Sequence, residues 1–150
     1  MRIKNIVIAS IFTLTSFSVC ADGSASVSLK ALSAWTNQSG STLYVDTVDS
    51  NGLLTGTYIN RAAGYGCQNI SYPVTGWVYG TAIAFNTIWQ STTESCNSIT
   101  AWTGFYYQGQ INTLWQLTIN GSTSTSQIIQ GGDVFKPSSS IQNKSLILEK

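Results

Sequence analysis

The sequence predicts an all-β fold, an eight-stranded antiparallel up-and-down β-barrel. From residue 32 onward, short apolar or aromatic runs alternate with Gly, Asn and Ser at strand-like spacing. No helical period is sustained in this part of the chain. Consecutive strands without a helix can remove their exposed edges by closing into a barrel, and a barrel of this size can hold one small ligand.

The strands follow one another along the chain with turn residues between them. We expect them at residues 31–37, 41–48, 53–60, 72–80, 81–90, 99–108, 111–120 and 127–136. Asn51-Gly52 marks a tight hairpin between the second and third strands. Longer connections are expected at 61–71 and 91–98. The sequence shows no internal repeat and no linker that would mark a second domain, so residues 22–137 are assigned to one barrel domain.

The stretch from residue 98 to 117 alternates, turns and alternates again. A turn at Gly109-Gln110 would place Trp102 opposite Leu117 and Gly104 opposite Trp115. One face then carries indoles and hydroxyls together: Ser98, Thr100, Trp102, Thr113, Trp115 and Leu117. This mixture suits a pocket that stacks a small ligand and hydrogen-bonds its edges, although tryptophans filling an ordinary β-core would give the same pattern.

The first 21 residues have the pattern of a secretory signal peptide. Arg2 and Lys4 precede an apolar run at residues 6–17, and small residues surround Cys20. This predicts a secreted or periplasmic protein; the alternative is a lipoprotein anchored through Cys20. At the other end, residues 138–150 are expected to form a flexible tail.

Removal of the signal peptide would leave Cys67 and Cys96. Because an exported protein meets an oxidising compartment, a disulfide between them is expected, with two buried free thiols as the alternative. The bridge would join the two long connections.

The composition argues against several classes of function. Charged residues make up 9% of the chain and the net charge is +1, so there is no basic surface for nucleic acid. Histidine is absent, which removes the commonest metal ligand and general base. We therefore expect a non-enzymatic protein that uses no metal or other cofactor and has no membrane partner.

Six motifs appear in the order and spacing of the avidin–streptavidin family of biotin-binding proteins, which the chain resembles from residue 32 to 136. They are WTNQSGS at 35–41, LTGTY at 54–58, Trp89, WTG at 102–104, INTLW at 111–115 and GDVF at 132–135. The paired cysteines and the run NRAAG at 60–64 resemble the dimeric bacterial branch of the family.

The resemblance implies high-affinity, non-covalent binding of biotin in the mouth of the barrel. It assigns donors for the ureido oxygen to Asn37, Ser41 and Tyr58, and acceptors for the ureido N–H groups to Asp133 and Asn60. The remaining implied contacts are Thr100 for the thiophene sulfur, Trp89, Trp102 and Trp115 as walls, Leu117 as an apolar floor, and Ser98 with the backbone of Ala62 to Gly64 for the valeryl carboxylate.

Two other functions fit parts of the sequence. A secreted carbohydrate-binding module would also use Trp and Asn, although sugar sites are usually shallow. A protease inhibitor on a similar barrel would place its working residues in an exposed loop and leave the polar interior unexplained.

A homodimer is the expected assembly. The hairpin face opposite the pocket carries Ile99, Ala101, Phe105, Tyr107, Leu114 and Gln116, which would leave a large apolar patch on a monomer. Tetrameric members of the family close the site of a neighbouring subunit with a tryptophan, and residues 122–126, STSTS, contain no aromatic residue.

Overall fold

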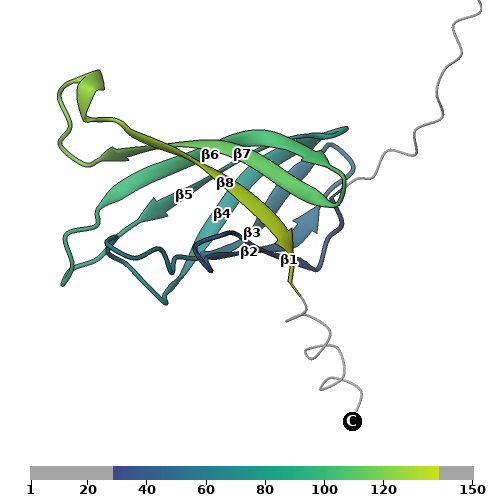
Figure 1. Cartoon of the computed structure of the whole chain (residues 1–150), viewed down its shortest axis with the longest axis horizontal. Coiled ribbons are helices and arrows are strands. Elements are labelled where there is room, and N and C mark those ends of the chain that lie inside the picture. Colours follow the sequence, from purple (N-terminus) through teal and green to yellow (C-terminus); the bar gives the residue numbers. More distant parts are fainter. Residues whose placement is uncertain (1–28, 139–150) are drawn as a thin grey trace, which may run out of the picture.

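The computed structural model describes residues 29–138, which form one closed antiparallel barrel (Figure 1). Each strand pairs with the next along the chain, and the last pairs with the first. The elements are β1 (Ser33–Thr36), β2 (Thr42–Val48), β3 (Leu53–Ile59), β4 (Ser71–Tyr79), β5 (Ala82–Trp89), β6 (Ser98–Tyr107), β7 (Gln110–Ile119), the 3₁₀ turn η1 (Thr125–Gln127) and β8 (Ile129–Pro137).

The predicted fold class and the order of the eight strands are confirmed. The predicted signal peptide (1–21) lies outside the described residues, and so does the predicted tail (138–150) except for Ser138, whose N–H donates to the Ala34 carbonyl at 2.8 Å. Within residues 29–138, no helix is long and apolar enough to cross a lipid bilayer.

The bounds of the first and last strands differ from the prediction. The first strand is only Ser33–Thr36. Asn37 lies in the turn to β2, where its N–H donates to the Ser41 carbonyl and its Oδ1 accepts from the N–H groups of Ser39 and Ser41. The last strand begins at Ile129 rather than Gln127. Before it lies η1, an unpredicted element in which Ser124 and Gln127 form a reciprocal capping box.

The predicted register of the β6–β7 hairpin is wrong by two residues. The turn is Gln108-Gly109, with φ values of 48° and 80°, as a two-residue turn matching the strand twist requires. Trp102 therefore lies opposite Trp115, and Gly104 opposite Thr113. A shift of two residues leaves every side chain on its original face, so the predicted inward row still faces the interior.

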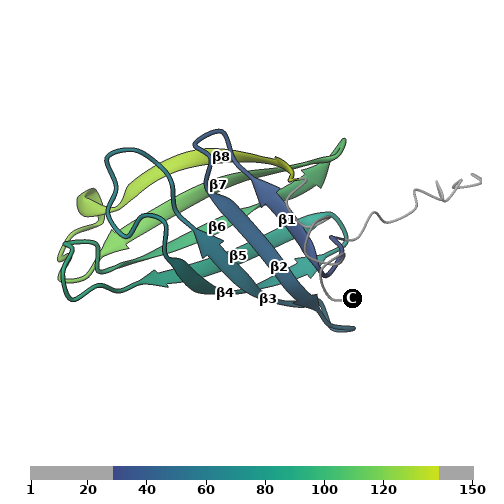
Figure 2. The same cartoon turned by 90° about the horizontal axis from the view of Figure 1, so that it is seen from below.

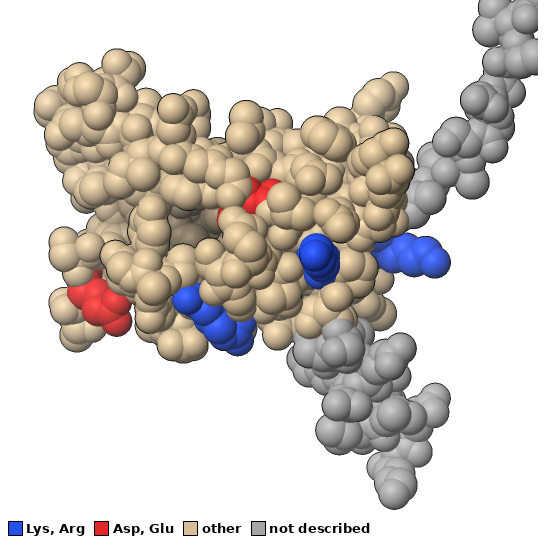
Figure 3. Space-filling model, viewed as in Figure 1, with Lys and Arg blue, Asp and Glu red and all other residues tan. Residues whose placement is uncertain are grey.

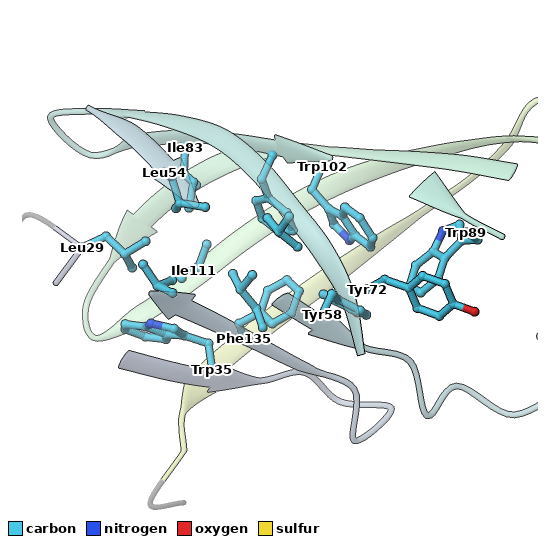
Figure 4. Close-up of a cluster of buried hydrophobic side chains, with 14 of the residues drawn as sticks. Leu29, Trp35, Leu54, Tyr58, Tyr72, Ile83, Trp89, Trp102, Ile111 and Phe135 are labelled. Atoms are coloured by element: carbon cyan, nitrogen blue, oxygen red, sulfur yellow. The ribbon is translucent and has the colours of Figure 1, made fainter. Parts of the chain in front are cut away.

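Hydrophobic side chains fill one end of the barrel and leave the other end open. Figure 4 shows Leu29, Trp35, Leu54 and Ile111 gathered at the filled end, while Trp89 lies toward the open end. The view in Figure 2 shows the strands crossing the barrel obliquely between these two ends. Leu29 is 5% exposed although it precedes β1, so the segment before the first strand plugs the barrel.

We predict that Leu29→Ala lowers the free energy of unfolding by about 2–5 kcal/mol, because it opens a cavity at the filled end of the core. Urea denaturation of the folded protein measures this change. Leu32→Ala is the matched control, since Leu32 is 76% exposed and its truncation opens no cavity. Equal stability of the two variants would contradict a plugging role for Leu29.

Candidate functional site

The open end of the barrel contains a cavity of about 480 Å³. Figure 3 shows a hollow toward the end that carries η1 in Figure 1, on a face with few charged side chains. Of the residues predicted from the sequence to face a ligand, Ala63 and Thr113 do not line this cavity, and Thr113 instead donates to the Asp133 carbonyl. The others all line it: Asn37, Ser41, Tyr58, Asn60, Ala62, Gly64, Trp89, Ser98, Thr100, Trp102, Trp115, Leu117 and Asp133.

Asp133 is the buried charge of the site, only 7% exposed. Its Oδ1 accepts hydrogen bonds from Asn37 Nδ2 and Gln38 Nε2, both at 2.9 Å. Its Oδ2 accepts one from Trp102 Nε1 at 2.9 Å. Three uncharged donors thus offset the cost of burying a carboxylate, and Oδ2 has capacity for a further donor from a ligand.

Three donors converge beside this carboxylate. Asn37 Nδ2 reaches Tyr58 Oη at 3.3 Å, and Ser41 Oγ reaches Asn60 Oδ1 at 3.4 Å. Both contacts lie at the long end of the hydrogen-bond range, so a ligand oxygen can replace them at little cost. Asn37, Ser41 and Tyr58 can then all donate to one acceptor.

Tyr58 is held in its neutral, donating form. Burial is the main cause that raises the pKa of its phenol, and the negative charge of Asp133 raises it further. A side-chain hydrogen bond with Ser41 acts in the opposite direction but does not reverse the shift. A phenol of ordinary pKa is already protonated at neutral pH, and the raised pKa of Tyr58 only widens that margin, so Tyr58 has a proton to donate to a ligand.

Asn60 provides a second acceptor, which meets the donor Ser41 as Asp133 meets the donor Asn37. Its amide is fixed by a bond from Nδ2 to the Gly66 carbonyl at 3.0 Å and by the Ala62 N–H, which donates to Oδ1 at 3.0 Å. Replacement of the long Ser41 bond would free a lone pair of Oδ1. The cavity therefore presents convergent donors flanked by two acceptors.

The aromatic walls are fixed by their neighbours. The Trp102 ring stacks on Phe85 at 4.9 Å with an interplanar angle of 11°, and Tyr58 lies 4.9 Å away on a 30° tilt. Trp89 Nε1 donates to Thr100 Oγ1 at 2.8 Å, which orients both side chains. The rings are thus positioned before any ligand enters.

The position of the Trp115 ring requires a glycine at residue 131 of β8. A Cβ added at Gly131 would lie 2.4 Å from the Trp115 ring, so the ring covers the backbone of β8 at this point. A larger residue at position 131 would therefore displace the Trp115 indole, which lines the cavity.

The predicted disulfide is present and joins Cys67 to Cys96. It connects the β3–β4 loop to the β5–β6 loop, and Glu94 adds a second link because its Oε2 accepts from the Cys67 N–H at 2.5 Å. Closure of a loop of 29 residues adds about 3–4 kcal/mol by chain entropy. The bonded sulfurs are not thiolates and so do not form a metal site with Glu94.

Sequence reasoning missed part of the lining. The additional residues are Gln38, Ser39, Tyr65, Gly66, Ser95, Cys96, Ile119, Ile129 and Gly132, of which Cys96 was predicted only as half of the disulfide. Strand alternation could have found Ile119 and Ile129, since they continue the inward rows of β7 and β8. Gln38 lies within the WTNQSGS motif, but no role was predicted for it, since its partners lie more than 90 positions away.

Comparison with known proteins agrees with this geometry. The sequence profile described as the Avidin family matches residues 25–138. The chain belongs to the avidin family.

Two avidin-family relatives are similar in sequence. Afifavidin from Afifella pfennigii is 40% identical over 107 residues, which cover 69% of this chain and 66% of afifavidin. Hoefavidin from Hoeflea phototrophica is 35% identical over 132 residues, which cover 81% of this chain and 80% of hoefavidin. The chain thus spans slightly less than two thirds of the length of afifavidin.

Solved avidin structures share the barrel. Apo shwanavidin has a TM-score of 0.70 and 62% identity, covering 74% of this chain and 98% of shwanavidin. Rhizavidin in complex with biotin has a TM-score of 0.64 and 47% identity, covering 73% of this chain and 92% of rhizavidin. Both support assignment to the bacterial branch of the avidin family.

In this avidin, Gln38 positions Asp133, a role that was not predicted from the sequence. Its Nε2 donates to the Gly132 carbonyl at 2.9 Å and its Oε1 accepts from the Val134 N–H at 3.0 Å, so its amide holds the backbone on both sides of Asp133. Together with the bond to Oδ1, these contacts fix where the carboxylate points.

We predict that Gln38→Ala weakens ligand binding through Asp133 and costs about 1–3 kcal/mol of binding free energy. Calorimetry of the folded variants measures the loss. Gln38→Glu is the informative comparison, since it keeps the size of the side chain but places a second carboxylate beside Asp133. Wild-type affinity in both variants would show that Asp133 does not need Gln38.

Proposed function

We propose that this avidin binds biotin non-covalently in the mouth of the barrel and catalyses no reaction. The observation that carries the proposal is the convergence of Asn37, Ser41 and Tyr58 between the acceptors Asp133 and Asn60. A cyclic urea has the complementary pattern, with one carbonyl oxygen between two N–H groups.

The rest of the cavity suits the remainder of biotin. Three indoles, Trp89, Trp102 and Trp115, line it and can pack on a saturated ring system. The hydroxyl of Thr100, held by the Trp89 N–H, is available to the sulfur. Ser98 and the backbone near Ala62 are assigned to the carboxylate.

The relatives support this assignment. Rhizavidin and a shwanavidin variant have been solved as biotin complexes, the latter with 61% identity to this chain. Among the described residues that line the cavity, Asp133, Tyr58 and Tyr65 are the titratable groups outside the disulfide, and they form no nucleophile–base pair. A binding protein is therefore favoured over an enzyme, and no observation favours the carbohydrate or protease-inhibitor alternatives.

Export from the cytoplasm forms part of the proposal. The disulfide supports it, because such bonds persist in oxidising compartments. The basic and apolar pattern of the first 21 residues predicts the signal that would direct it.

We predict that the mature protein binds biotin without added metal or cofactor and that the ligand raises the melting temperature. Asp133→Ala and Tyr58→Phe should each weaken binding, by about 1–3 kcal/mol for the phenol and by more for the charged group. Titration calorimetry and dissociation rates measure these effects. A folded wild-type protein that gives neither heat nor a thermal shift with biotin would end the proposal.

We propose further that two copies pair through the outer face of β6 and β7. Leu114 is 70% exposed and Tyr107 60% exposed on this face, and Ile99 and Phe105 are also exposed. Neither strand carries a charged residue, and the outward row of β6 is apolar apart from Thr103, whereas a solvent-facing strand usually carries polar or charged side chains. On β7 the exposed apolar residue of this face is Leu114, which lies opposite Thr103. Two-fold pairing would bury the patch, since the same surface serves both partners.

Light scattering of the mature protein should give about twice the mass of the chain. We predict that Leu114→Glu shifts this mass toward one chain, because pairing would bury two carboxylates against apolar surface. Leu32→Glu at an exposed position away from these strands should leave the mass unchanged. A wild-type mass of one chain, or of four, would contradict the dimer.

A further inference from the structure

Glu94 lies in the β5–β6 loop and does not line the cavity, yet its carboxylate is directed at the β3–β4 loop. Ser91 Oγ accepts from the Glu94 N–H at 2.9 Å, and the Glu94 carbonyl accepts from the Cys96 N–H at 3.0 Å. These bonds fix the backbone of Glu94, and its Oε2 accepts from the Cys67 N–H at 2.5 Å. Cys67 is fully buried, so its N–H would be left unpaired without this acceptor.

The Cys67 N–H and the Gly66 carbonyl belong to one peptide group. Because that group is planar and trans, its N–H and C=O point in opposite directions. The Gly66 carbonyl accepts from Asn60 Nδ2 at 3.0 Å, so Glu94 holds one side of the peptide group and Asn60 holds the other. Hydrogen bonds in such a chain polarise one another, and the carboxylate therefore makes the carbonyl a stronger acceptor for Asn60.

The bond to Gly66 helps to determine which end of the Asn60 amide meets a ligand. Asn60 is 8% exposed and lines the cavity, and its Oδ1 accepts from the Ala62 N–H at 3.0 Å and meets Ser41 Oγ at 3.4 Å. Rotation of the amide by half a turn would put Nδ2, a donor, where the site offers an acceptor. The Gly66 carbonyl opposes that rotation, because in the rotated amide it would face Oδ1, a second acceptor.

The Gly66–Cys67 peptide group needs a partner on its N–H because the backbone here is strained. Cys67 has a φ of 55°, in the left-handed region that residues with a side chain rarely adopt. Rotation of this peptide group alone would return φ to negative values and turn the Gly66 carbonyl away from Asn60. Gly66 offers little resistance, since a residue without Cβ tolerates both orientations. The disulfide fixes the side chain of Cys67 and not the plane of the preceding peptide group, whereas the bond to Glu94 opposes the rotation directly.

We propose that Glu94 is a positioning residue for the ligand site: by holding the Gly66–Cys67 peptide group, it keeps Asn60 Oδ1 in place as an acceptor for a ligand N–H. The inference rests on the proposed binding of biotin and adds to it a residue that touches no ligand. The two links between the loops then have separate roles. The disulfide joins the loops, and Glu94 sets the orientation of one peptide group within them.

Dissociation rates of biotin from the mature protein test this role, with the disulfide shown to be intact by mass spectrometry. Glu94→Ala should raise the rate about tenfold, because a hydrogen bond to a charged group is lost from the support of Asn60. Glu94→Gln keeps an acceptor oxygen at the same reach and should stay within about threefold of wild type. Asp46→Ala is the matched control, since it removes an exposed carboxylate from β2 and should leave the rate unchanged.

A double-mutant cycle separates an action through Asn60 from a general effect on the loop. In an Asn60→Ala background, Glu94→Ala should change the biotin dissociation rate by less than about twofold, because the group that Glu94 positions is gone. A full tenfold change in that background would overturn the action through Asn60, as would a wild-type rate in the single variant Glu94→Ala. Failure of the wild-type protein to bind biotin would instead overturn the proposed function, and the inference with it.

Discussion

A buried carboxylate without a cation organises this barrel. Asp133 on β8 is held by Asn37 and Gln38 from the β1–β2 connection and by Trp102 from β6. Each donor is neutral, so the full charge remains available to a ligand N–H. Burial is the main cause of the raised pKa of Tyr58, and the charge of Asp133 raises it further. Asp133 is thus an acceptor of the site and also holds one of the donors, Asn37, in place.

Asp133 lies on β8, which has its shortest strand pairing in the barrel with β1. β1 is only four residues long and pairs with β8 at two positions, Trp35 with Pro137 and Thr36 with Lys136. Gln38 continues this seam with its side chain, because its amide bonds on both sides of Asp133 resemble those of a neighbouring strand. Closure of the barrel and alignment of the binding carboxylate therefore use the same contacts.

Local patterns in the sequence sufficed for the fold, and the resemblance sufficed for most of the residues that line the cavity. The inward row of β6 and β7 survived a wrong turn assignment because side-chain direction repeats every two residues. The position of that turn depended on positive φ at Gln108, which its residue type does not favour. Gln38 and Glu94 escaped prediction because each acts on backbone that only the folded chain brings near. Alternation along the sequence predicts which side chains face the interior of the barrel. It does not predict hydrogen bonds between distant residues, because these form only when the barrel closes.

The free site is already close to the arrangement a ligand requires. Asn37, Ser41, Tyr58 and Asn60 satisfy one another through bonds of 3.3 and 3.4 Å, while the bonds that hold their frames in place are 2.8–3.0 Å long. Exchange of the long bonds for ligand bonds leaves the short ones intact, so little conformational order must be acquired on binding. The loops at the mouth would be the exception, and there a covalent bridge between Cys67 and Cys96 supplies the rigidity that strands supply deeper in the barrel. A deep site built on strands and an entrance fixed by a cross-link together give one chain a preformed pocket.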